Sequence, residues 1–212
     1  MTGKRIVQDG YDVLAATYLR VRSDDSEDVR LLAELKSRLP DGARILDAGC
    51  GAGTPVARTL SDRYRVTGVD ISATQIALAR EAVPNATFVQ ADMSALEFPA
   101  ASFDAIVSYY AIIHVPRDEH PALLAGFRRM LTPGGLLLIS MGASDNPDDT
   151  EDNWLGGATM YWSHYGRADN LRLITHAGFR IIWERLVTED ESFGCGTHLF
   201  VLAERGAPHS SP

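Results

Sequence analysis

Cysteine, basic charge and long hydrophobic runs are all scarce in this sequence, and each scarcity excludes a class of protein. Only Cys50 and Cys195 are present, without the paired spacing of a zinc site, so we expect two buried thiols and neither a disulfide scaffold nor a structural metal. Lysine and arginine number 20 against 28 aspartate and glutamate residues, and the formal net charge of −8 argues against a broad nucleic-acid-binding surface.

The N-terminal and apolar stretches give no sign of export or membrane insertion. The opening MTGKRIVQDGYD lacks the apolar segment of a secretory signal, and the longest apolar run, around LLLISM, is too short to cross a bilayer. We therefore predict a cytoplasmic protein without membrane contact, acting on a small-molecule or peptide substrate. Residues 206–212 are expected to form a flexible tail.

What the sequence does contain is an alternation of strand and helix patterns. With 212 residues, 45% of them hydrophobic, the chain can form one α/β domain, predicted over residues 1–205. The alternation predicts a mostly parallel sheet with helices on both faces, closed by an antiparallel hairpin that has no helix between its strands. Strands are expected at 43–49, 65–70, 86–92, 103–110, 135–141, 179–187 and 197–204.

Helix patterns precede the first strand and follow most of the others. Residues 1–40 carry two of them, with apolar or aromatic side chains at helical spacing over 11–18 and 32–39. Thr54 is a candidate N-cap with Pro55 in the first helical position. Ser72 begins a capping-box pattern that opens the next helix.

Three glycines follow the first predicted strand, in ILDAGCGAGTP. Gly49, Gly51 and Gly53 stand where a helix should begin, which indicates that something must approach the backbone closely. In open α/β sheets, ligands bind at this turn, beyond the carboxyl ends of the strands. A nicotinamide dinucleotide site would carry G-x-G-x-x-G, with its third glycine where this chain has Thr54, so the pattern disfavours that ligand.

Carboxylates end three consecutive predicted strands. They are Asp47, Asp70 and Asp92, and the second follows the glycines at the distance typical of a ribose-binding acid. A row of carboxylates repels phosphate and suits a ligand that carries a positive charge, a diol and an amine.

At these positions the sequence resembles the class I S-adenosylmethionine-dependent methyltransferases. The resemblance rests on ILDAGCGAG, VTGVDIS, QADM, FDAIVSYYAIIHV and LTPGGLLLIS, in that order and spacing, and extends over nearly the whole chain. It implies a Rossmann-like, seven-stranded α/β sheet with strand order 3-2-1-4-5-7-6. It also implies that residues 1–40 cap the cofactor and that the connection 143–170 covers the acceptor.

The resemblance implies a role for each matching residue toward S-adenosylmethionine. Gly49 and Gly51 would face the methionine portion, Asp47 its amino group, Asp70 the ribose and Asp92 the adenine amine. The remaining cofactor residues would be Ile71 and Met93 beside the adenine, Ser108 at the end of the fourth strand, and Tyr11, Tyr18 and Arg22 facing the methionine carboxylate.

Simpler interpretations remain open for several of these residues. Asp47 could only cap the helix after the glycine turn, Asp92 could be a loop residue, and Tyr11 and Tyr18 could be ordinary packing aromatics. The chain could also bind the cofactor without catalysis and act through partners, or be a nicotinamide-dependent oxidoreductase.

The segment after the fourth strand narrows the acceptor class by comparison with the family. SYYA replaces the motif of nucleic-acid amino methyltransferases, and neither paired glutamates nor metal-binding aspartates follow Ser108. We expect metal-independent methylation of a small molecule or peptide. His114 is the leading candidate base, with His164 and Tyr110 behind it, although a backbone-bonded histidine is an equal alternative for His114.

Two further features near the expected acceptor side are left with two interpretations each. Tyr161, Trp162 and Tyr165 could form an aromatic wall or pack in the core, and His198 is expected to be structural. The acidic run SDNPDDTEDN, 144–153, could be a solvated loop or an acidic rim that selects a cationic acceptor.

Overall fold

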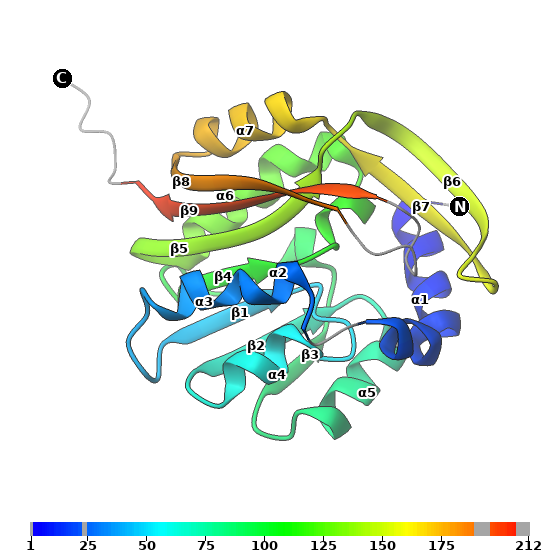
Figure 1. Ribbon diagram of the computed structural model, residues 1–212, viewed down its shortest axis with the longest axis horizontal. Coiled ribbons are helices and arrows are strands. Elements are labelled where there is room, and N and C mark those ends of the chain that lie inside the picture. The colour runs from blue at the N-terminus through cyan, green and yellow to red at the C-terminus, as the bar shows by residue number, and fades with distance from the viewer. Residues whose placement is uncertain (1, 23–24, 189–195, 207–212) are drawn as a thin grey trace.

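The computed structural model describes residues 2–22, 25–188 and 196–206, and a mixed sheet of seven strands forms its centre (Figure 1). The order β3-β2-β1-β4-β5-β9-β8 confirms the predicted topology, because the two extra strands β6 and β7 form a separate sheet. Neighbours are parallel except at β9, which is antiparallel to β5 and β8. The strands of the main sheet are β1 (Arg44–Ala48), β2 (Arg65–Asp70), β3 (Thr87–Gln90), β4 (Phe103–Ser108), β5 (Leu131–Gly142), β8 (Phe179–Thr188) and β9 (Thr197–Arg205).

Helices cover both faces of this sheet, as the alternating pattern predicts (Figure 1). On one face the buried side chains of α2 (Glu27–Arg30), α3 (Leu32–Lys36), α4 (Val56–Ser61) and α5 (Ala73–Ala82) share a core with one set of strand residues. On the other, α6 (His120–Met130) and α7 (Arg167–His176) pack on the alternate set. Ile45 and Leu46, adjacent in β1, belong to the two different cores, because successive strand residues point to opposite faces.

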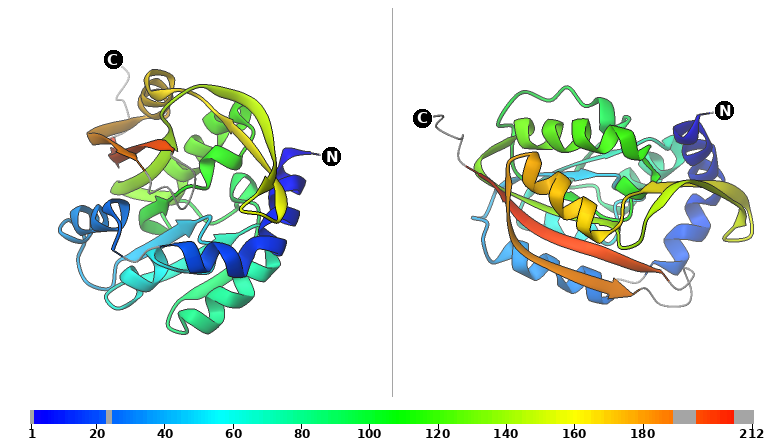
Figure 2. Two further views of the ribbon diagram at one scale, coloured as in Figure 1. Left: turned by 45° about the vertical axis from the view of Figure 1, so that its right-hand side comes forward. Right: turned by 90° about the horizontal axis from the view of Figure 1, so that it is seen from above.

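The first helix stands apart from both cores. Helix α1 (Gly3–Val21) packs on a two-stranded sheet formed by β6 (Asn146–Trp154) and β7 (Ala158–His164), at the carboxyl end of the parallel strands (Figure 2). Val7 and Leu14 are its buried contacts with Trp154 and Met160. Val13, one of the apolar residues in the predicted pattern over 11–18, is 67% exposed.

The β6–β7 hairpin corrects the interpretation of the acidic run as a loop. Strand β6 contains almost the whole run and is exposed at nearly every position, so only Trp154 at its end is buried. The sequence lacks the period-2 alternation that would have signalled a strand. Strand β6 is held in an extended conformation by its pairing with β7, whose Met160 and Tyr161 are buried.

Local signals at the helix starts were correct in part. Ser72 accepts a hydrogen bond from the Gln75 N–H at 3.1 Å and caps α5 as predicted. Helix α4 begins one residue later than expected, with Pro55 rather than Thr54 in the cap position and no side-chain cap of its own. Cys50 is a buried free thiol, whereas Cys195 and residues 207–212 lie outside the described residues.

Candidate active site

The glycine turn between β1 and α4 has left-handed backbone conformation at all three glycines, with φ of 78° at Gly49, 52° at Gly51 and 76° at Gly53. A Cβ on Gly49 would lie 2.2 Å from the Ala111 Cβ, so this glycine permits a close approach of two loops. A Cβ on Gly51 would meet only the Gln75 side chain, at 3.8 Å. Gly51 therefore opens onto a cavity.

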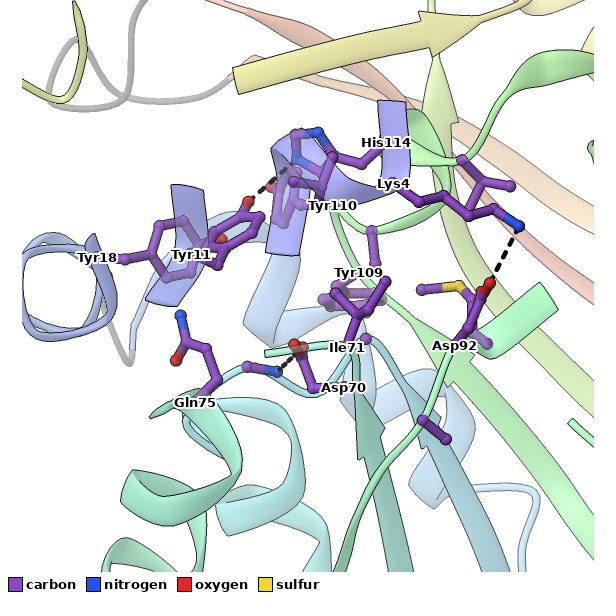
Figure 3. Close-up of a pocket in the computed structure, with 17 residues that line it drawn as sticks. Lys4, Tyr11, Tyr18, Asp70, Ile71, Gln75, Asp92, Tyr109, Tyr110 and His114 are labelled. Carbon is purple, nitrogen blue, oxygen red and sulfur yellow. Dashed lines mark hydrogen bonds and ion pairs between the residues drawn. The ribbon is translucent and has the colours of Figure 1, made fainter. Parts of the chain in front are cut away.

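That cavity lies beyond the carboxyl ends of the parallel strands, beneath α1 (Figure 3). Its volume is about 640 Å³ including the part open to solvent. It brings together ten of the residues predicted from the sequence: Tyr11, Tyr18, Gly49, Gly51, Asp70, Ile71, Asp92, Met93, Tyr110 and His114.

A second, smaller cavity adjoins the first and holds two more of the predicted residues. Asp47 and Arg22 line it together with Tyr18, Gly49 and Gly51, which also line the first cavity. The two cavities thus form one hollow with carboxylates at both ends and the glycine turn between them.

Asp70 fixes the glycine turn from the end of β2. Its Oδ2 accepts the Gly51 N–H at 2.8 Å and its Oδ1 accepts the Ser72 N–H at 2.9 Å. Burial raises the pKa of Asp70 to about 6, although these two N–H groups favour the charged form. The carboxylate is therefore positioned by the backbone and still lines the cavity, with lone pairs left for a ligand.

Asp47 is buried at the end of β1 and is only half satisfied. One oxygen accepts the Ala57 N–H in the first turn of α4, whereas Oδ2 has no hydrogen-bond partner among the described residues. The capping interpretation is thus correct for one oxygen and leaves the other for a ligand. Burial and the charge of Asp70 raise the pKa of Asp47 to about 8.

These raised pKa values predict how the stability of the ligand-free protein depends on pH. Both carboxyls have folded pKa values above their unfolded ones, so the folded state binds more protons between about pH 4 and pH 8, and stability falls as pH rises through that range. We expect Asp47→Asn, which keeps the acceptor for Ala57, to stabilise the ligand-free protein at pH 8 by on the order of 1–3 kcal/mol.

Urea unfolding at pH 5 and pH 8 measures this effect. Asp41→Asn serves as a control, because Asp41 is an exposed carboxylate paired with Arg63 on the surface. If Asp47→Asn gains no stability relative to wild type at pH 8, Asp47 carries no charge that is costly to bury.

Asp92 has a partner that the sequence did not reveal. Lys4 from α1 lies 3.0 Å from Asp92 Oδ2 and also contacts Glu119, while Oδ1 accepts the Ser94 N–H and hydroxyl at 2.9 Å (Figure 3). Partial burial alone would raise the pKa of Asp92, but the hydrogen bonds from Ser94 and Lys4 hold it below its ordinary value. Lys4 therefore ties α1 to the rim of the cavity. No local pattern could pair positions 4 and 92.

His114 is held between two partners in the 3-10 turn η2 (Ile112–His114). Its Nδ1 lies 2.7 Å from the carbonyl oxygen of Tyr161, which can only accept, so the proton of the neutral ring is on Nδ1. Nε2 then accepts the Tyr11 hydroxyl at 3.0 Å. Burial lowers the pKa of His114 to about 4, which corrects the expectation of an imidazole titrating near neutrality.

Tyr110 lies where the cavities meet. Its backbone is left-handed, with φ of 55°, an uncommon conformation for a bulky residue, and its N–H donates to Ser140 Oγ at 2.6 Å. The Arg22 guanidinium lies 4.6 Å from the centre of its ring and forms a buried ion pair with Asp28. Arg22 thus lines the second cavity, but its guanidinium is paired with the Asp28 carboxylate of α2.

Two predicted residues are not brought to the hollow. Ser108 is fully buried and donates to the Ala48 carbonyl at 2.7 Å, and it lines none of the cavities described. His164 lies at the end of β7, with Nδ1 2.9 Å from the Ser144 carbonyl oxygen, also apart from the cavities. Both side chains form hydrogen bonds to backbone carbonyl groups of neighbouring segments.

A third cavity, about 290 Å³ including its open part, extends from the first on the side of the β6–β7 hairpin. It shares four residues with the first cavity and adds residues from segments far apart in the chain. Its lining comprises Tyr11, Tyr18, Tyr110, Ile113, His114, Trp154, Trp162 and His198. Of the three aromatic residues considered for a wall, Trp162 lines this cavity and Tyr161 and Tyr165 do not, whereas Trp154 and His198 were not expected there.

The described residues carry no helix long and apolar enough to cross a membrane. Within the same ranges, no group of three histidine, cysteine, aspartate or glutamate side chains is arranged to hold a metal ion.

Comparison with known proteins shows which sequences and structures this chain is similar to. Residues 45–135, which include the glycine turn and the ends of β1 to β4, match the sequence model of a methyltransferase domain. A trans-aconitate 2-methyltransferase of Azoarcus sp. is 39% identical over 54% of this chain and 46% of its own length, and one of Variovorax paradoxus is 32% identical over 72% and 60%. The chain thus spans about half of the curated relatives it matches.

A solved structure shares the whole architecture. The magnesium protoporphyrin IX methyltransferase of Synechocystis PCC 6803, crystallised with S-adenosylhomocysteine, has a TM-score of 0.72 at 18% identity. The match extends over 97% of this chain and 100% of that one. At this identity the similarity establishes the fold.

Proposed function

This chain belongs to the class I S-adenosylmethionine-dependent methyltransferases, and from that premise we propose that it is an active enzyme that methylates a small-molecule acceptor. The observation that carries the proposal is the row of carboxylates Asp47, Asp70 and Asp92 along the hollow, at the carboxyl ends of three adjacent strands. S-adenosylmethionine supplies, when bound, a methyl group on a positively charged sulfonium.

The residues of the hollow fit that cofactor chemically. Asp47 Oδ2 and Gln75 Oε1 are buried acceptors without partners, which suits a ligand rich in N–H and O–H donors. We propose that Asp47 faces the amino group, Asp70 the ribose and Asp92 the adenine amine, with Ile71 and Met93 beside the ring. A phosphate would meet three carboxylates and is disfavoured.

For the transfer itself, the protein must position the acceptor and exclude water. An acceptor with an O–H or N–H must also lose a proton. We propose that this proton passes to Tyr11 Oη while the Tyr11 hydroxyl proton moves to His114 Nε2, leaving the Nδ1–H bonded to the Tyr161 carbonyl. His114 is neutral at physiological pH and so is ready to accept.

We expect His114→Ala to lower kcat at least about tenfold for an acceptor that must lose a proton, because general-base help is typically worth about 10²–10⁴-fold. The affinity for S-adenosylhomocysteine should be nearly unchanged. Tyr11→Phe should act in the same direction, since it removes the linking hydroxyl. Because the pKa of His114 is lowered to about 4, the wild-type rate attributable to this group should fall near pH 4 rather than near 6.5.

Steady-state kinetics across pH 4–8 test this proton path. His176→Ala is the matched control, since His176 is an exposed histidine at the end of α7 whose Nδ1 lies 2.8 Å from the Arg172 carbonyl oxygen of the same helix. Wild-type turnover by His114→Ala with a neutral acceptor would assign His114 a structural role.

Two alternatives predict different outcomes. A protein that binds the cofactor and acts through partners would produce no S-adenosylhomocysteine with any acceptor of a broad panel, whereas an enzyme produces it with at least one. An oxidoreductase would bind NADH. The substrate of the trans-aconitate relatives is a polycarboxylate, and no lysine or arginine among the described residues lines the third cavity, so we do not transfer that acceptor to this chain.

A further inference from the structure

The third cavity has walls made almost entirely of aromatic rings. Trp154 lies edge-on to Trp162 and to Tyr11, each with ring centres 5.7 Å apart. His114 is tilted against Trp162 at 4.4 Å, and on the Tyr110 side His198 lies edge-on at 4.9 Å. The rings come from α1, η2, the β6–β7 hairpin and β9, so the cavity exists only in the folded protein.

The described part of this lining disfavours charged ligands. Apart from two imidazoles, the lining within the described residues contains no ionisable group other than tyrosines, and burial keeps His114 neutral. The nearest arginine, Arg22, lines the neighbouring cavity and is paired with Asp28. A buried carboxylate would lose its hydration here without an ion pair from the described residues, which costs several kcal/mol. An ammonium would recover part of that loss from the ring faces.

One lining group lacks a hydrogen-bond partner. The Trp162 Nε1–H is buried and bonds to no described residue. An indole N–H can only donate, so it needs a lone pair. A hydroxyl oxygen or an aromatic ring nitrogen of a ligand would supply one, whereas an ammonium group has no lone pair to offer.

We propose that the third cavity binds the methyl acceptor, and that the acceptor is an uncharged, single-ring aromatic molecule with a hydroxyl or ring nitrogen. The volume of about 290 Å³ is less than half the 640 Å³ of the first cavity, both including their open parts, which favours one ring over a larger system. The shared residues Tyr11 and His114 place the heteroatom of such a ring next to the proposed proton path. That the bound ring is the methyl acceptor rests on the proposed function. That the cavity binds such a ring does not.

Binding of three matched probes tests the ligand class. Phenol, benzoate and benzylammonium, each with one ring, are titrated at pH 7 by ligand-observed NMR against the full chain, with and without S-adenosylhomocysteine. We expect phenol to bind at least about tenfold more tightly than either ion, because benzoate meets no lysine or arginine in the described lining and benzylammonium has no lone pair for the Trp162 N–H. Tighter binding of benzoate or benzylammonium, or no binding of phenol, overturns the proposal.

Two variants locate the binding. Trp162→Phe keeps a ring but removes the donor, and should weaken phenol binding about threefold to tenfold, the value of one hydrogen bond. Trp183→Phe is a matched control, because Trp183 on β8 also has a buried Nε1–H without a partner and lies outside the cavity. Equal effects of the two substitutions, or none at Trp162, contradict the assignment.

The proposed ring site and the proposed methyltransferase function can each be contradicted without the other. If S-adenosylhomocysteine does not bind but phenol does, with the expected loss in Trp162→Phe, the ring site stands and the proposed methyltransferase function falls. If S-adenosylhomocysteine binds and phenol does not, the ring site falls while the proposed function is unaffected.

Discussion

Gly51→Val is expected to abolish binding of S-adenosylmethionine and S-adenosylhomocysteine while the protein remains folded. A Cβ at Gly51 meets nothing closer than the Gln75 side chain at 3.8 Å, so a valine side chain would project into the hollow that the ligand needs. The left-handed backbone, with φ of 52°, adds strain of about 1–2 kcal/mol, which a domain of this size tolerates. We expect calorimetry to show at least about 100-fold weaker binding, equivalent to about 2.8 kcal/mol.

Gly42→Val is the matched control for backbone strain. Gly42 has φ of 78° and open space where its Cβ would be, and it lies at the opposite end of β1 from the glycine turn. This control should lose similar stability and keep its affinity. Wild-type affinity in folded Gly51→Val would mean that the glycines only form a tight turn.

Asp70→Ala is expected to weaken cofactor binding by about 2–4 kcal/mol, because two charge-assisted hydrogen bonds to a ribose would be lost. The substitution also releases the N–H groups of Gly51 and Ser72, so the glycine turn itself should loosen. Since the pKa of Asp70 is raised to about 6 and the carboxylate form binds the diol, wild-type affinity should decline as pH falls through 6. The variant should lack this decline.

Asp104→Ala separates the loss of a backbone contact from the loss of a ligand contact. Asp104 accepts the Arg44 N–H at 2.9 Å, but at the amino end of the parallel strands, away from the hollow. We expect a comparable loss of stability with unchanged calorimetric affinity. Unchanged affinity in Asp70→Ala itself would remove Asp70 from the site.

The sequence predicted the alternation of strands and helices and the strand-end residues because both depend on local patterns, whereas the strand order was implied by the resemblance to a family. Asp47 and Asp70 end apolar runs that alternate with helices, and the ends of parallel strands meet at one edge. The same reasoning failed for β6, whose acidic residues are exposed and carry no period. Pairing with β7 and packing against α1 determine the conformation of β6, and neither interaction can be predicted from the sequence of β6 alone.

The acceptor side was the least predictable part of the site. His114 lines the first cavity, but its partners Tyr11 and the Tyr161 carbonyl come from segments 103 and 47 residues away, and the burial that lowers its pKa follows only from the fold. His198 was expected to be structural and lines the third cavity. Lys4 gave no signal at all, because an ion pair between a helix and a distant loop follows no spacing rule.

The central claim is that the hollow at the carboxyl end of the sheet is a site for S-adenosylmethionine. Isothermal titration of the full chain with S-adenosylhomocysteine, and in parallel with NADH, tests it most directly. We predict one binding site per chain for S-adenosylhomocysteine, weakened at low pH as Asp70 becomes protonated, and no heat of binding for NADH. Binding of NADH in preference to S-adenosylhomocysteine, or of neither ligand, would contradict it.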